Sequence, residues 1–209
     1  MDYNARDLRL ELEYVGQDLS KFANQQRMSQ LSEDIAYQIW IDISSGMEYL
    51  HANDVVHLDI KAQNILLSES RRAKICDFGY SVQHAIKPIP FNGGTPTYTP
   101  PEFVLSGNRW RPADVWGSGL VMGFVLGIWE LQPAGDWRIA DIRHKPGPAA
   151  KMLEWFDKVE RNKKRIPDKH SLLLKMLTRD PTKRVTSSDL VKNLRALPQV
   201  KALTGELLL

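Results

Sequence analysis

The sequence predicts a mostly helical α+β fold, with a short β-hairpin region around one polar loop and a buried helix at its centre. Three observations lead to this prediction. A long amphipathic segment covers residues 32–50, a segment that is apolar on nearly every side covers residues 112–128, and short apolar runs flank the polar stretch 57–64. A helix that is apolar all round needs other elements around it, so the second segment is expected to form the axis of the fold.

The composition narrows the classes of function and partner. Of the 209 residues, 43% are hydrophobic and 25% are charged, as in ordinary globular proteins, and the net charge of +3 is too small to indicate nucleic acid as a partner. The single cysteine, Cys76, excludes an internal disulfide and fits a reducing compartment. The longest apolar run, residues 119–129, is shorter than the ~18 residues that cross a bilayer. We therefore expect an intracellular protein, cytoplasmic or nuclear, without a membrane partner.

Toward the amino end, the pattern predicts one strand and one helix. Apolar residues alternate with charged ones at positions 8, 10, 12 and 14, which is the period of a half-buried strand, and Gly16 then interrupts it. Ser32 is placed to cap a helix, with Glu33 and Asp34 in the first turn. Apolar residues then recur at helical spacing as far as Leu50, so a helix of about five turns is expected there.

The second half of the chain predicts further helices. The central helix should start near Pro112 and be ended by Pro133 and Gly135. The stretch that follows, up to residue 148, has the composition of a loop. Three more helices are expected over residues 149–161, residues 171–177, and from a capping box at Thr186 to Leu197, where Pro198 stops the last one.

Polar residues with complementary chemistry lie in and after the stretch 57–64. Asp59 could accept a proton from a hydroxyl, and Lys61 could hold a phosphoryl group during its transfer. Asn64 and Asp77 offer the hard oxygen ligands that divalent metal ions prefer. Two short runs between them, residues 65–67 and 74–76, are suited to paired strands that would bring the two ligands together.

These residues occur in the order and spacing of a known pattern. It consists of His57-Leu58-Asp59 with Asn64, Asp77-Phe78-Gly79, the stretch 94–102 that ends in Pro100-Pro101-Glu102, Asp114-x-Trp116-x-x-Gly119, and Arg184. The pattern resembles the eukaryotic protein kinases, whose catalytic loop reads H-R-D-x-x-x-x-N and is followed by D-F-G and A-P-E. We refer to residues 57–64 as the catalytic loop and to residues 80–99, which are rich in Pro, Gly and Thr, as the activation segment.

The resemblance implies a reaction and the residues that carry it. ATP and Mg²⁺ would be the cofactors and a protein the substrate, with catalytic roles for Asp59, Lys61, Asn64 and Asp77. Asn64 and Asp77 would be the metal ligands. Thr95, together with Lys61, favours serine and threonine over tyrosine as the phosphate acceptor.

The resemblance also implies a nucleotide site and a set of structural residues. Backbone groups of Glu13 and Val15 would face adenine, Leu66 would lie beneath the adenine ring, and Asp18 would bind a ribose hydroxyl. The matches with structural roles are His57, Phe78, Gly79, Glu102, Asp114 and Arg184, the last expected to pair with Glu102.

Two departures from the family pattern affect the interpretation. The arginine of the catalytic loop, which in many relatives receives an activation-segment phosphate, is Leu58 here, so the chain is of the non-RD type. No Gly-rich loop, strand lysine or helix glutamate precedes Leu8. We therefore interpret residues 1–209 as a truncated kinase domain, in which residues 1–16 are the last strand of the small lobe with the hinge and residues 17–197 are the helical large lobe.

Three functions remain open at this point. The first is a serine/threonine protein kinase, represented by a fragment without its small lobe. The second is a catalytically impaired, pseudokinase-like interaction module, which the absent phosphate-binding parts and Leu58 favour. The third is a small-molecule kinase, and Thr95 with the Glu102 and Arg184 pair argues against it. The sequence indicates neither the substrate nor the oligomeric state.

Overall fold

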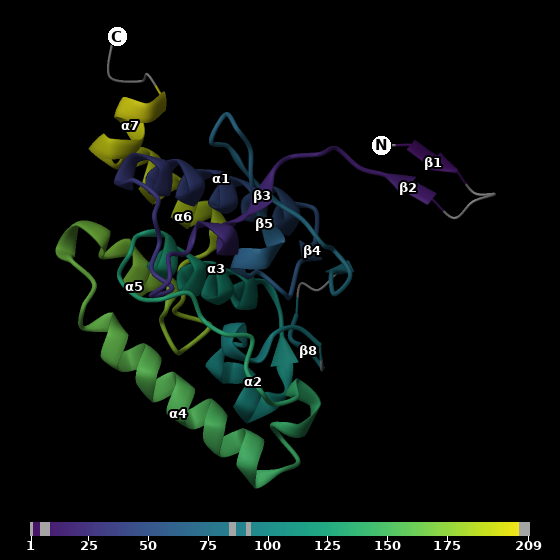
Figure 1. The fold of residues 1–209 in the computed structure, drawn as a ribbon. Helices are drawn as coiled ribbons and strands as arrows, with labels where there is room; N and C mark the ends of the chain where they lie inside the picture. Colours follow the sequence, from purple (N-terminus) through teal and green to yellow (C-terminus); the bar gives the residue numbers. More distant parts are fainter. Residues whose placement is uncertain (1, 5–8, 84–86, 91–92, 205–209) are drawn as a thin grey trace.

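The computed structural model describes residues 2–4, 9–83, 87–90 and 93–204, and its main body is built around two long helices (Figure 1). Helix α1 (Glu33–Ala52) and helix α3 (Arg111–Val125) pack against each other, and the remaining helices surround them. These are α2 (Pro101–Ser106), α4 (Pro146–Lys163), α5 (Leu172–Met176), α6 (Ser187–Ala196) and α7 (Pro198–Thr204). No helix in this described part of the chain is long and apolar enough to span a membrane.

The strands are short, and those among the described residues form four small antiparallel sheets. The largest has the order β3 (Gln17–Asp18), β5 (Ile65–Leu67), β6 (Ala73–Ile75), so a hairpin directly follows the catalytic loop. The other pairs are β1 (Asp2–Asn4) with β2 (Arg9–Glu11), β4 (Val55–Val56) with β7 (Val82–Gln83), and β8 (Ile89–Pro90) with β9 (Asn108–Arg109). The last two pairs attach the activation segment to the helical body.

Helix α3 is the axis of the body, in the segment where a buried central helix was predicted. Every residue from Ala113 to Val125 is buried. Two glycines allow neighbours to come close: a side chain at Gly117 would stand 2.7 Å from the Ile60 carbonyl oxygen, and one at Gly123 would overlap the ring of Trp129. The catalytic loop therefore rests directly on the backbone of α3.

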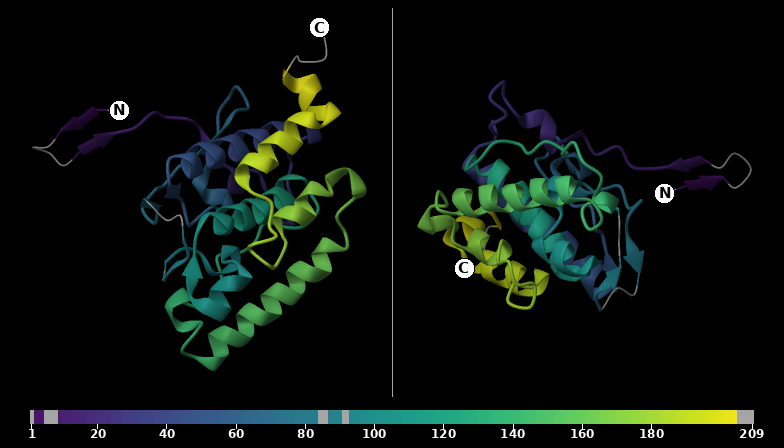
Figure 2. Two further views of the ribbon diagram at one scale, coloured as in Figure 1. Left: turned by 180° about the vertical axis from the view of Figure 1, so that it is seen from behind. Right: turned by 90° about the horizontal axis from the view of Figure 1, so that it is seen from below.

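Helix α1 carries the predicted apolar stripe and joins the sheet to the helical base. Its residues Ile39, Ile43 and Met47 are at most 1% exposed and belong to the same core as α3. The structure begins the helix after Ser32, as predicted, although the Ser32 hydroxyl makes no capping hydrogen bond. Helices α6 and α7 pack along α1, while α4 runs along an outer edge of the body (Figure 2).

The prediction of a half-buried strand at residues 8–14 was wrong in part. The described strand β2 ends at Glu11, and Leu12 and Tyr14 are 63% and 87% exposed, while Leu8 lies outside the described residues. Strand β2 pairs with β1 in a hairpin that projects away from the body (Figures 1 and 2). The alternating pattern correctly predicted a strand over Arg9–Glu11, but Leu12 and Tyr14 lie beyond its end, and no element in the described part of the chain covers them.

Two predicted helix ends also differ from the structure. Helix α3 ends at Val125, well before Pro133, because the chain turns back at Gly127, where φ is +67°, and Trp129 packs on Gly123. Pro198 ends α6 but also begins α7, since proline suits the first position of a helix. The predicted capping box at Thr186 is confirmed: its hydroxyl oxygen accepts a hydrogen bond from the Asp189 amide at 3.1 Å.

A buried ion pair fastens α2 to the base of the helical body. The Arg184 guanidinium donates to both carboxylate oxygens of Glu102, at 2.9 and 2.8 Å, and the two side chains are 0% and 7% exposed. The same guanidinium donates to three backbone carbonyls, including that of Pro112 at the start of α3, and lies over the Trp116 ring. Each charge therefore has a partner of opposite sign, whereas a buried ion without such a partner would be strongly unfavourable.

Substitution of Arg184 by alanine should strongly destabilise the fold, because the Glu102 carboxylate would stay buried without its partner. We expect the free energy of unfolding to fall by about 3–5 kcal/mol, measured by urea denaturation. Lys183→Ala is the matched control, since the Lys183 side chain is 78% exposed and its ion pair with Asp180 spans 3.7 Å. An Arg184→Ala midpoint equal to that of the control would contradict the assigned role.

A second buried contact should make stability depend on pH. The Tyr37 hydroxyl lies 3.1 Å from Nδ1 of His170. Burial, and then the nearby Lys169 charge, lowers the pKa of His170 below its usual 6.5, with Glu33 opposing the shift. The unfolded chain then takes up this proton first as the pH falls, so the stability from neutral His170 is present above about pH 6.5 and is lost below it.

Urea midpoints between pH 7.5 and 5.5 test this dependence. The parent should lose stability over that interval, and His170→Gln should lose less, because glutamine does not titrate. The exposed His144 provides a matched control, His144→Gln, which should keep the parental slope. Equal slopes in the parent and in His170→Gln would show that His170 is not the group responsible.

Candidate active site

The catalytic loop is held in place by one carboxylate of the central helix. Asp114, which is 1% exposed, accepts the amide of His57 at 2.8 Å on Oδ2 and the amide of Leu58 at 2.7 Å on Oδ1. Its Oδ2 also lies 3.0 Å from Nε2 of His51, whose Nδ1 is 2.9 Å from the Ser187 hydroxyl. These bonds stabilise the left-handed backbone of Leu58, whose φ of +66° is unfavourable for leucine.

His57 connects the catalytic loop to the segment that carries Asp77. The imidazole is fully buried, its Nδ1 accepts the Asp59 amide at 3.3 Å, and its Nε2 donates to the Cys76 carbonyl at 3.0 Å. The ring also packs against the edge of Phe78, with the ring centres 5.1 Å apart. Both nitrogens of His57 are engaged in hydrogen bonds within the protein, and the scaffold roles expected for His57 and Phe78 stay predictions.

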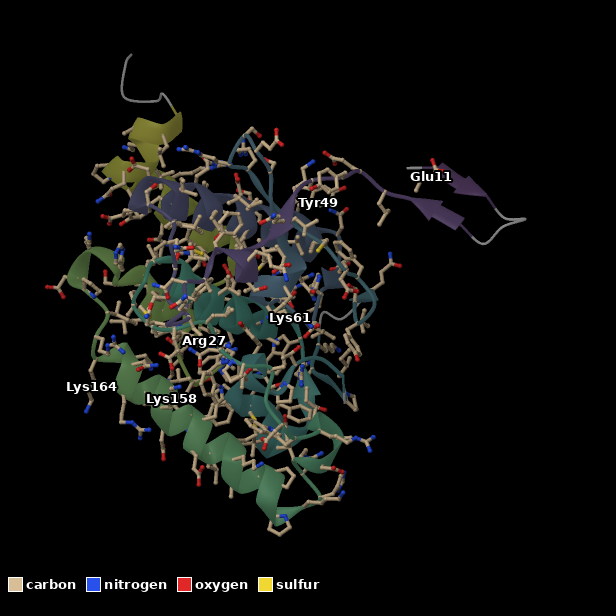
Figure 3. The ribbon with its side chains drawn as sticks, in the orientation of Figure 1. Glu11, Arg27, Tyr49, Lys61, Lys158 and Lys164 are labelled. Atoms are coloured by element: carbon tan, nitrogen blue, oxygen red, sulfur yellow. The ribbon has the colours of Figure 1, made fainter. Side chains whose placement is uncertain are left out.

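The Asp59 carboxylate is the centre of a hydrogen-bonded cluster. It is 3% exposed; its Oδ1 accepts the Thr95 hydroxyl at 2.8 Å, and its Oδ2 accepts Nζ of Lys61 at 2.7 Å and Nδ2 of Asn64 at 3.2 Å. Lys61 also reaches the Thr95 hydroxyl at 3.1 Å. The structure therefore brings together four of the predicted site residues, with Lys61 placed where the sheet meets the helical body (Figure 3).

The geometry around Thr95 suits chemistry on an aliphatic hydroxyl. Its oxygen lies within hydrogen-bonding distance of a carboxylate that can accept its proton and an ammonium that can stabilise negative charge. A general base must lie within about 2.6–3.2 Å of the proton-bearing atom. The Asp59 to Thr95 distance meets this requirement, so the cluster can polarise a serine or threonine hydroxyl.

Asp77 follows β6 in a turn next to the catalytic loop. Its φ is +61°, its side chain is exposed, and its Oδ1 accepts the Gly79 amide at 3.2 Å. The amide of Cys76 donates to the Asn64 carbonyl at 2.9 Å and thereby connects the Asp77 turn to the catalytic loop. Burial first, and then the carboxylates of Asp77 and Asp18, raise the pKa of the Cys76 thiol, so it stays neutral at physiological pH.

The donor set of this region fits the protein's share of a magnesium site. Mg²⁺ is usually bound by one or two carboxylates together with substrate phosphates and water. Asp77 supplies a carboxylate, and Asn64 supplies an amide oxygen, because its nitrogen donates to Asp59. Among the described residues no three His, Cys, Asp or Glu side chains gather to form a complete metal cage.

The residues predicted to contact the nucleotide base and sugar do not join this cluster. Leu66 is half-buried in β5, opposite Asp18 of β3, and the Asp18 carboxylate accepts the Ser20 amide at 2.9 Å. Glu13 is 67% exposed in its side chain and pairs with Lys74 at 2.7 Å, and Val15 is half-buried on the same linking segment. Their roles toward adenine and ribose stay predictions.

Leu58 is buried at the place where the family pattern has an arginine. Its side chain is 5% exposed and forms a small apolar cluster with Val56 and Ala113, against which Val82 and Ile89 of the activation segment pack. A leucine in this environment stabilises the contact between the two segments by burial of apolar surface and offers nothing to a phosphate.

Sequence reasoning did not identify two buried polar residues next to the site. His51 follows Met47 by four positions on the buried face of α1, a spacing that could have indicated its burial. Arginine is usually an exposed residue, yet Arg109 is 2% exposed. Its contact with the Leu58 carbonyl joins residues that are 51 positions apart, and the local pattern contains no signal for it.

Comparison with known proteins identifies the family. The model of the protein kinase domain family matches residues 3–194, so the chain belongs to the protein kinase family and the resemblance seen in the sequence is confirmed.

The curated relatives include kinases of plants and fungi, among them a plant serine/threonine-protein kinase. The chain is 32% identical over 167 residues to the SNF1-related protein kinase catalytic subunit alpha KIN12 of Arabidopsis thaliana. This alignment covers 77% of the chain and 31% of the relative. The chain is 31% identical over 169 residues to the CBL-interacting serine/threonine-protein kinase 10 of the same plant, covering 78% and 33%. The Aurora kinase of Yarrowia lipolytica is 33% identical over 192 residues, covering 88% and 47%. The chain thus spans about a third of the first two relatives.

Proposed function

We propose that this chain carries the catalytic centre of a protein kinase that transfers the γ-phosphoryl group of ATP to serine or threonine hydroxyls of a protein substrate. The observation that carries the proposal is the position of the Thr95 hydroxyl, bound by both Asp59 and Lys61. A substrate hydroxyl that displaced it would meet the same two groups. The serine/threonine kinases among the relatives support the same reaction class.

Each residue of the cluster has a separate role in the transfer. The Asp59 carboxylate orients the acceptor hydroxyl and accepts its proton, as the oxygen forms a bond to the γ-phosphorus and the bond to ADP breaks. The Lys61 ammonium stabilises the negative charge on the transferred group. Asn64 and Asp77 would hold Mg²⁺, which would neutralise phosphate charge. His57, Phe78 and Asp114 keep these groups in register.

We further propose that transfer requires a small lobe that covers the nucleotide. Ahead of β3, the described residues form the projecting hairpin of β1 and β2 and a linking segment over residues 12–16, and Glu11 of the hairpin lies far from Lys61 (Figure 3). The same proposal includes a domain boundary at residue 16, nucleotide contacts by Glu13, Val15, Asp18 and Leu66, and a cytoplasmic or nuclear location.

The test is to assay the chain alone and the chain fused to the small lobe of KIN12, with Mg-ATP and protein substrates. Transfer by neither form would instead favour an interaction module.

Asp59→Asn and Asp77→Asn should each abolish transfer in the active form. Asparagine at 59 cannot accept the proton, which corresponds to a loss of about 10²–10⁴-fold in kcat, and asparagine at 77 removes the only carboxylate proposed to bind magnesium. Radiolabel transfer to serine and threonine peptides measures both. Asp180→Asn, at an exposed carboxylate bonded to Thr182, is the control and should keep parental activity. Near-parental turnover of either site variant would contradict the assigned roles.

Transfer should also be independent of phosphate on the activation segment. The Leu58 side chain offers no hydrogen-bond donor, so the contact that the family's arginine makes to that phosphate cannot form. Treatment with a phosphatase, confirmed by mass spectrometry of residues 80–99, should change kcat/KM less than about twofold. A reproducible tenfold loss would contradict this expectation.

A further inference from the structure

Arg109 is a buried cation between the activation segment and the catalytic loop. It is 2% exposed, at the end of β9, and its guanidinium lies over the Phe103 ring at 4.6 Å. One terminal nitrogen reaches the Leu58 carbonyl at 3.4 Å, and the other donates to the Thr99 hydroxyl at 3.1 Å. A single side chain thus contacts both segments whose relative position defines the proposed site.

The surrounding charges are arranged to keep Arg109 ionised. Burial lowers its pKa to about 10, and the carboxylates of Asp59, Glu102 and Asp114 oppose that shift. The guanidinium therefore remains protonated at neutral pH. Each of the three carboxylates is also fixed by its own bonds, to Lys61 and Thr95, to Arg184, and to the catalytic-loop amides respectively. The charges that favour the protonated guanidinium therefore come from side chains that are themselves fixed in place.

A continuous chain of hydrogen bonds leads from Arg109 to the Asp59 carboxylate. The Thr99 hydroxyl, which accepts from Arg109, donates to the Thr95 carbonyl at 3.1 Å. The Thr95 hydroxyl in turn donates to Oδ1 of Asp59 at 2.8 Å. Displacement of Arg109 would therefore release the end of the activation segment that carries Thr95.

Gly94 shows how closely the two segments meet at Arg109. Its φ is +93°, and a side chain there would stand 2.9 Å from the Leu58 carbonyl oxygen, 3.0 Å from a guanidinium nitrogen of Arg109 and 3.5 Å from Oδ1 of Asp59. The activation segment can approach the catalytic loop only with glycine at this position.

We propose that Arg109 is a positioning residue that holds the activation segment on the catalytic loop permanently, without a phosphate. The cation that the family pattern places at position 58 is absent, and a cation from β9 binds the backbone carbonyl of that same residue, Leu58. Unlike a surface arginine, Arg109 is enclosed and already engaged, so its bonds need no modification to form. This inference concerns the regulation of the site and rests on the proposed kinase function.

The first test measures hydrogen exchange in the 209-residue chain. Arg109→Met removes the charge and donors at similar volume, and amide exchange in residues 93–99 should become at least about tenfold faster, while α4 keeps its parental rates. Thr99→Val removes the hydroxyl that accepts from Arg109, and it should also make amide exchange faster in residues 93–99. Arg111→Met is the matched control, because Arg111 pairs with Asp54 at the partly exposed start of α3; its exchange pattern should equal the parent's.

The second test measures kinetics in the fusion that carries a small lobe. Arg109→Met should lower kcat for peptide phosphorylation by about tenfold or more and leave the KM for ATP unchanged, because only the acceptor side is disturbed. Arg109→Lys, which keeps the charge, should recover part of kcat. Phosphatase treatment should leave the parent active.

The outcomes separate this inference from the proposed function. Parental exchange at residues 93–99 in Arg109→Met overturns the role of Arg109, whatever the activity. If Arg109→Met does not fold, Thr99→Val and Gly94→Ala decide instead, and parental exchange in both has the same consequence. A parent fusion that transfers no phosphate overturns the proposed function, while the exchange measurements still decide whether Arg109 holds the segment.

Discussion

The arrangement of the site depends on the buried Asp114 carboxylate. An ionised carboxylate inside a helix core would be strongly unfavourable if its oxygens had no partners. Here two catalytic-loop amides and His51 meet those oxygens, so burial of the charge and ordering of the loop depend on each other. Each hydrogen bond to a charged group contributes about 1.5–3 kcal/mol. Because α3 is enclosed on every side, Asp114 cannot follow a displaced loop, and the loop is fixed relative to the core.

The sequence predicts well those features that local chemistry determines. The apolar stripe of α1, the burial of α3 on nearly every side, and the Thr186 cap each follow from residues within a few positions of one another. Features set by contacts between distant residues were predicted less well. The early end of α3 depends on Trp129 folding back on Gly123, and the exposure of Leu12 and Tyr14 depends on the absence of any described element over them. Neither is visible in a periodic pattern.

The same division applies to the site. Asp59, Lys61, Asn64 and Asp77 lie within 19 positions of each other, and their spacing matched a family pattern, so they were identified together. Thr95 was also found by resemblance, and the structure places its hydroxyl on Asp59. Arg109 was missed because its burial results from Phe103, Leu58 and Thr99 converging on it from separate elements. Nothing in the residues next to it, Asn108 and Trp110, indicates that this arginine is buried.

The family pattern has a cation at position 58, whereas this chain has Leu58 and a cation at position 109. This difference changes how the order of the activation segment would be controlled. An arginine at position 58 would bind a phosphate that is added to the activation segment and can be removed again. A cation enclosed among Asp59, Glu102 and Asp114 interacts at lower effective dielectric and is screened less. Meanwhile Leu58 replaces an ionic contact by apolar packing with Val82 and Ile89. If Arg109 has the proposed role, the activation segment becomes ordered when the helical body folds. The side chains that hold the segment are buried residues, and unlike a phosphate group they are not added or removed after folding.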